Sequence, residues 1–153
     1  MPAPDPEPIV QALAVGVTGD HQRGLSLLQP LVDAGPTSTF ALLCSLAETA
    51  SKEARDAHGP DTWFGIDVSG PGGQADISVL PPPIQFAARF VTAWANRDRD
   101  MAHALFWAVA GPSDRDGTDD LANAITAVYG MAVAAAEHIV LEQRHKREQP
   151  GPR

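Results

Sequence analysis

The chain has 153 residues, of which 44% are hydrophobic, so it can form one domain of ordinary size with a real core. Nineteen acidic residues against eleven basic ones give a net charge of −8, and an acidic surface is repelled by nucleic acid. Cys44 is the single cysteine, which excludes an internal disulfide, and the proline-rich start lacks the basic and apolar segments of a signal peptide. We therefore expect a cytoplasmic protein for which nucleic acid is an unlikely partner.

One helical pattern occurs twice along the chain. An apolar helix runs into Gly19-Asp20, and 78 residues later another runs into Arg97-Asp98. The helix after each aspartate carries apolar residues at the same offsets, namely Leu27, Leu28 and Leu31 in the first copy and Leu105, Phe106 and Val109 in the second. Each copy continues with a Gly-Pro pair (35–36 and 111–112), which predicts a helix end, and then with a third apolar helix. Duplicated units bury each other's apolar faces, so the fold class that we predict is mostly α, a helical bundle of two related three-helix units.

The first unit, residues 9–59, should contain helices at about 8–17, 20–34 and 39–57. Proline is tolerated in the first turn of a helix, and Asp20 is a suitable N-cap for the second helix. Pro30 lies inside that second helix, where it removes a hydrogen bond and should kink or split it. Residues 1–8 are expected to form a flexible proline-rich tail.

Between the two units the hydrophobic pattern changes to a period of two. Apolar residues alternate with polar ones on both sides of a glycine-rich turn at 70–73; they are Phe64, Ile66 and Val68 before it, and Ile77 and Val79 after it. This pattern predicts an inserted β-hairpin at about residues 62–80. An isolated two-stranded ribbon is only marginally stable, so the hairpin should rest on the helices.

The second unit, residues 84–146, should contain helices at about 84–96, 101–110 and 120–146, with a polar loop at 112–118. Asp98 or Asp100 can cap the middle helix. Within the last helix, apolar residues form a heptad seam: Leu121, Ile125, Val128, Ala132, Ala135 and Ile139. The seam predicts either the central helix of a single domain (residues 9–146) or a homodimer through residues 121–139. Residues 147–153 should be a flexible tail.

The apolar stretch 121–141 is long enough to span a bilayer. However, alanine dominates it, and Glu137 would be costly in a single span. A buried central helix is therefore the interpretation we favour, with no membrane association.

The sequence predicts no catalytic residue, no cofactor and no metal. Glu142 and His145 have the Glu-x-x-His spacing of di-metal helical bundles, but the second motif and the further glutamates of such sites are missing, and Arg144 and Lys146 would oppose a cation. Cys44 lies beside an apolar helix stripe, so we interpret it as a small buried hydrophobe.

The remaining functional signal is aromatic. Trp63 and Phe64 are consecutive in a strand-like pattern, so they should point to opposite faces, and only one of them can pack on the bundle. We therefore predict a non-catalytic interaction or adaptor module that binds a protein partner of unknown identity. The partner-binding candidates are Trp63, Phe64, Ile66 and Trp107.

Two alternatives belong to other functional classes. A small-molecule binder or enzyme would have its pocket between the units, where His103, Trp107 and His138 could converge. In a protein-interaction module, His138 would instead be a satisfied core residue. A nucleic-acid-associated regulator would use the basic C-terminal end or a face with Arg89, Arg97 and Arg99.

Overall fold

The computed structural model describes residues 6–148 except 60, 67 and 71–72. Within the described residues the chain forms six α-helices and one short ribbon. The helices are α1 (Pro6–Val17), α2 (His21–Asp33), α3 (Pro36–His58), α4 (Pro82–Ala95), α5 (Arg99–Asp116) and α6 (Asp120–Glu148). The predicted all-α bundle, with three helices followed by three, is confirmed.

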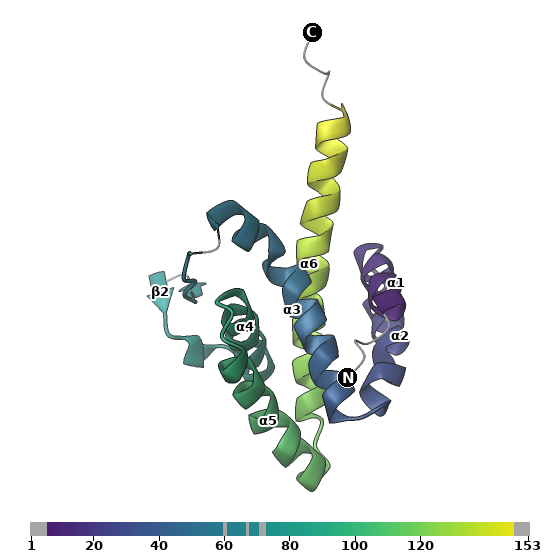
Figure 1. The fold of residues 1–153 in the computed structure, drawn as a ribbon, viewed down its shortest axis with the longest axis vertical. Helices are drawn as coiled ribbons and strands as arrows, with labels where there is room; N and C mark the ends of the chain where they lie inside the picture. The colour runs from purple at the N-terminus through teal and green to yellow at the C-terminus, as the bar shows by residue number, and fades with distance from the viewer. Residues whose placement is uncertain (1–5, 60, 67, 71–72, 149–153) are drawn as a thin grey trace.

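Helices α3 and α6 pack against each other at the centre of the bundle, as Figure 1 shows. The α1–α2 pair lies on one side of them, and the α4–α5 pair lies on the other. The largest fully buried side chains come from both units: Leu28, Leu42, Leu43 and Leu46 from the first, and Phe90, Phe106, Val128, Tyr129 and Val133 from the second. The two units therefore share one core.

The two predicted repeat turns have the same hydrogen bonds. In each turn the aspartate N–H donates to the carbonyl five residues earlier, at 3.2 Å for Asp20 and 2.9 Å for Asp98. Each carboxylate then accepts the backbone N–H three residues later, at 3.1 Å in both cases. Asp20 is therefore the N-cap of α2, as predicted, and of the two candidates for α5 it is Asp98 that forms the cap.

Two predicted helix breaks are wrong. Pro30 does not split α2, and the Gly111-Pro112 pair does not end α5, which continues to Asp116 and stops at Gly117 with φ 65°. The buried Ser113, in the part of α5 beyond Pro112, forms hydrogen bonds with residues at the start of α6 and just before it. Its hydroxyl donates to the Thr118 carbonyl at 2.8 Å and accepts the Leu121 N–H at 3.3 Å.

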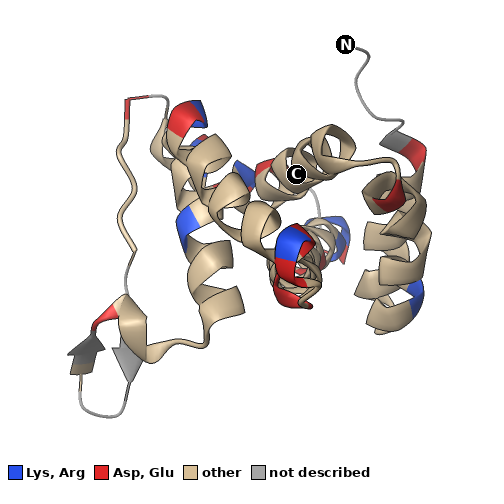
Figure 2. Cartoon of the chain, turned by 90° about the horizontal axis from the view of Figure 1, so that it is seen from below, with Lys and Arg blue, Asp and Glu red and all other residues tan. Residues whose placement is uncertain are grey.

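The predicted β-hairpin at residues 62–80 is also wrong. Residues 61–66, which we call the strap, are in neither helix nor strand, and Ile77–Val79 is a 3-10 helix, η1. Among the described residues, strand pairing is confined to two three-residue segments, β1 (Val68–Gly70) and β2 (Gly73–Ala75). Figure 2 shows the strap as an extended segment at one edge of the molecule, outside the helices.

Side chains explain why the alternating pattern does not become a longer hairpin. The side-chain amide of Asn96 forms hydrogen bonds with both the N–H and the carbonyl of Phe64, which are the groups that strand pairing would use. The carboxylate of Asp76 accepts the Ser78 N–H at 2.9 Å, which starts the 3-10 turn. Val79 is 65% exposed, so the alternating apolar residues have no common buried face.

Much of the heptad seam of α6 is covered within one chain. Ile125, Val128 and Ala132 are buried, whereas Ala135 and Ile139 are half-buried. Beyond them, α6 projects from the bundle (Figure 1), and residues 141–148 are exposed. By length and composition alone α6 could cross a membrane: an 18-residue window has a mean hydropathy of 1.6, and 33% of that window is buried in the bundle.

Tyr129 connects α6 to the α1–α2 pair. Its side chain is fully buried, and its hydroxyl donates to the Ala12 carbonyl at 2.6 Å. Burial raises the pKa of Tyr129, and the nearby charge of Asp20 raises it further, so the hydroxyl remains a donor. A Cβ at Gly16 or at Gly24 would overlap this hydroxyl. Close approach of α1 and α2 to Tyr129 therefore requires both glycines.

Gly24→Ala should lower the free energy of unfolding by about 2 kcal/mol or more, because the new Cβ meets the Tyr129 hydroxyl and lies 2.8 Å from the Ala12 carbonyl oxygen. Gly130→Ala is the matched control: it adjoins Tyr129 in α6, and a Cβ there meets nothing within 4 Å. The control should be neutral or stabilising by up to about 1 kcal/mol. Urea denaturation measures both, and equal stabilities of the two variants would contradict the packing described.

Candidate functional site

The strap is fixed to the bundle at Phe64. The Phe64 N–H donates to Oδ1 of Asn96 at 2.6 Å, and Nδ2 of Asn96 donates to the Phe64 carbonyl at 2.9 Å. The ring of His58, the last residue of α3, makes an edge contact with the Phe64 ring at 6.0 Å between centroids. The end of α3 and the end of α4 together position the strap.

The predicted partner-binding residues differ in exposure. Trp63 is 72% exposed, whereas the adjacent Phe64 is half-buried, and Ile66 is 39% exposed. Trp107 is 43% exposed, but it lies on α5, where it contacts His103 and Phe106. Among the contacts described here, none joins Trp107 to the strap. The structure therefore groups Trp63 and Ile66 on the strap and separates Trp107 from them.

A basic groove lies between α3 and the turn that joins α4 to α5. It consists of two adjoining cavities of about 330 and 280 Å³. The lining residues are Glu48, Lys52, Arg55, Asp56 and Gly59 from α3 and its end, and Trp94, Arg97 and Arg99 from the facing side. Four of the eleven basic residues of this acidic chain therefore line one groove.

Glu48 organises the groove. Its Oε2 atom accepts a hydrogen bond from Arg55 at 2.6 Å and another from the Trp94 indole at 2.7 Å. Burial by itself would raise the pKa of Glu48, but the two hydrogen bonds and the charges of Arg55 and Lys52 outweigh burial and lower it. Glu48 therefore stays ionised and holds both partners in place.

Two features of the basic side chains stand out. The Nε of Arg55 is buried and has no hydrogen-bond partner among the described residues. Arg97 has φ 59°, which lies in the left-handed region. The equivalent residue in the first repeat is Gly19, with φ 100°. A non-glycine residue in this region is strained, and such strain is typical of functional positions. In the second turn, the residue in the strained conformation is therefore Arg97, a basic residue that lines the groove.

Arg99 extends the groove towards a more apolar cavity of about 450 Å³. The Arg99 guanidinium lies 5.7 Å from the centroid of the Trp94 ring, in cation–π geometry. The lining residues of this cavity are Phe40, Ala41, Cys44, Trp94, Arg99, Asp100 and His103. Arg89, predicted to share a face with Arg97 and Arg99, is not among the residues that line these cavities.

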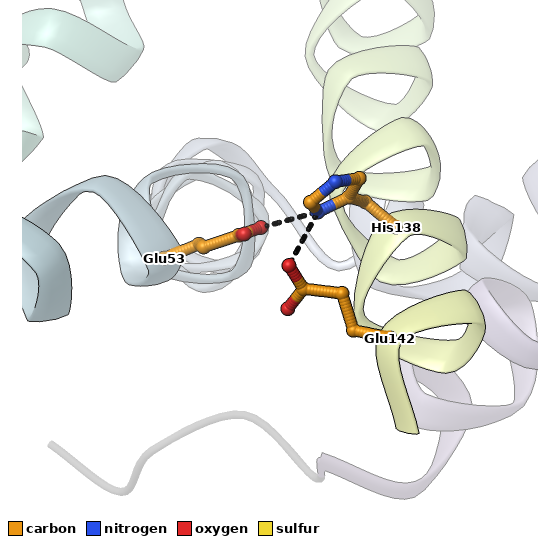
Figure 3. Close-up of side chains that lie close together, drawn as sticks. All are labelled: Glu53, His138 and Glu142. Atoms are coloured by element: carbon orange, nitrogen blue, oxygen red, sulfur yellow. Dashed lines mark hydrogen bonds and ion pairs between the residues drawn. The ribbon is translucent and has the colours of Figure 1, made fainter. Parts of the chain in front are cut away.

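The predicted pocket of His103, Trp107 and His138 is only partly assembled. The Trp107 indole donates to Nε2 of His103 at 2.9 Å, so these two residues meet on α5. His138 is elsewhere: it lies on α6, and its Nδ1 is 2.8 Å from Oε2 of Glu53 on α3 (Figure 3). Its side chain is 57% exposed, so the prediction of a core histidine is wrong. Full burial on α6 ends at Val133, before the helix reaches this turn.

Comparison of the chain with protein-family models, with curated proteins and with solved structures found no match. The functional assignment therefore rests on the strap and the groove themselves.

Cys44 should be unreactive in the folded protein. Burial raises the pKa of its thiol to about 11, although the charge of Arg99 lowers it in part. At pH 8 its thiolate fraction, and with it the rate of alkylation by iodoacetamide, should be roughly two orders of magnitude below that of an ordinary cysteine. Mass spectrometry measures this rate, with the guanidinium-unfolded chain as the control. Similar rates in the two states would show that the thiol is not shielded.

Proposed function

We propose that this chain is a non-catalytic interaction module that binds a protein partner with the strap and the adjoining basic groove. The observation that carries the proposal is Trp63, whose side chain is 72% exposed while the backbone of the next residue is held by Asn96. Because the backbone beside Trp63 is already held, little backbone entropy is lost when the indole binds. Tryptophan is also enriched among the residues that dominate binding energy at interfaces.

The groove supports a particular kind of partner. It adjoins the strap, because Gly59 lines it just before the strap begins, and Arg97 follows the Asn96 that holds Phe64. Arginine binds carboxylates through paired hydrogen bonds, and Arg97 and Arg99 both line the groove. A partner segment with an apolar residue beside acidic residues fits both features.

Selection of random peptides displayed on phage, with the wild-type protein as bait, tests the proposal. Enriched peptides should combine an apolar residue with neighbouring Asp or Glu. Their Kd should rise by about tenfold or more for Trp63→Ala, which removes the anchor. Arg97→Ala should also weaken binding and reduce its dependence on salt, because it removes one of the charges in the groove.

Leu141→Ala is the matched control for this experiment. Leu141 is also an exposed apolar residue, at 62%, but it lies on the projecting end of α6. Its substitution should leave peptide affinity unchanged. The proposal fails if no peptide is enriched, if enriched peptides bind Trp63→Ala as tightly as wild type, or if Leu141→Ala weakens binding equally.

A further inference from the structure

Outside the groove, three potential metal ligands meet where α6 leaves the bundle. Glu53 comes from α3, and His138 and Glu142 lie one turn apart on α6, facing Glu53 (Figure 3). Nδ1 of His138 lies 2.8 Å from Oε2 of Glu53 and 3.9 Å from Oε1 of Glu142. One ligand atom from each of the three residues falls within 4.8 Å of the other two.

These distances are close to those of a metal site. Nitrogen and oxygen ligands bind zinc at about 2.0–2.1 Å, so in a tetrahedral site two ligand atoms lie roughly 3.3 Å apart. The two distances from Nδ1 of His138 bracket that value. All three side chains are partly exposed, so they have room to adjust to a bound ion.

We propose that Glu53, His138 and Glu142 form a binding site for a divalent transition-metal ion, with zinc as the representative ion. One imidazole nitrogen and two carboxylates supply three ligands, and water would complete the coordination. The two carboxylates neutralise the charge of the ion.

The site has a structural consequence. Its ligands come from both central helices, so a bound ion would connect α3 to α6 at the point where burial on α6 has ended. An ion that binds only the folded arrangement stabilises it. The ligand set also differs from the Glu142–His145 spacing in the sequence, because the cluster combines Glu142 with His138.

Competition for zinc with a chromophoric chelator at neutral pH tests the site. The wild-type chain should bind one zinc ion in this site, and both Glu53→Gln and His138→Ala should weaken binding by about tenfold or more. His145→Ala is the control and should leave the affinity within about twofold, because His145 is not one of the ligands. Zinc should also raise the Tm of the wild-type chain, but not that of Glu53→Gln.

Three results would overturn the proposal. One is the absence of zinc binding by the wild-type chain at millimolar zinc. Another is zinc binding that persists in Glu53→Gln but is lost in His145→Ala, which would assign the ion to a local chelate within α6. The third is an equal rise in Tm for wild type and Glu53→Gln, since the proposed ion bridges two helices. Circular dichroism confirms that each variant is folded before zinc is added.

Discussion

The hydrogen bond from Tyr129 to the Ala12 carbonyl is the contact on which the first half of the bundle depends. The tyrosine reaches from the central helix α6 into a niche that Gly16 and Gly24 leave open between α1 and α2. A buried hydroxyl without an acceptor would be costly, so this bond favours one position of the α1–α2 pair. With that pair on one side of α3 and α6, the α4–α5 pair covers the other side, and the core is shared by both units.

The same packing creates the candidate binding surface. Contact between α3 and α4 brings Trp94 to Glu48, and the turn after α4 brings Arg97 to the groove while Asn96 holds the strap. The two repeat turns share their backbone hydrogen bonds, but they differ in the residue at the left-handed position. Gly19 occupies that position in the first turn, and Arg97 occupies it in the second. The two turns therefore share a backbone arrangement but differ in charge at this position.

Local patterns in the sequence predicted the helices and the Asp20 N-cap, because these depend on hydrophobic spacing and on short-range hydrogen bonds. Asp98 as a cap and the central position of α6 were each one of two alternatives. The hairpin prediction failed because Asn96, about thirty residues further along the chain, binds the backbone of Phe64. The groove and the Glu53–His138 pair also escaped prediction, since their residues lie far apart in sequence. Two signals in the sequence were available. Gly24 within an otherwise regular helix indicates the close approach of another side chain, which is Tyr129. An arginine in the second repeat, where the first has Gly19, indicates a position chosen for its charge, and Arg97 lines the groove.

In this structure the strap is a preformed surface that presents Trp63 next to a backbone held by Asn96. The most direct test is the hydrogen exchange rate of the Phe64 amide, measured by NMR in the free protein. Because this N–H donates to Asn96, its exchange should be at least about tenfold slower than in an unstructured chain, and Asn96→Ala should abolish the protection. Exchange of the Phe64 amide at the unstructured rate in the wild-type protein would show that the strap is not fixed and that Trp63 is not held on a preformed surface.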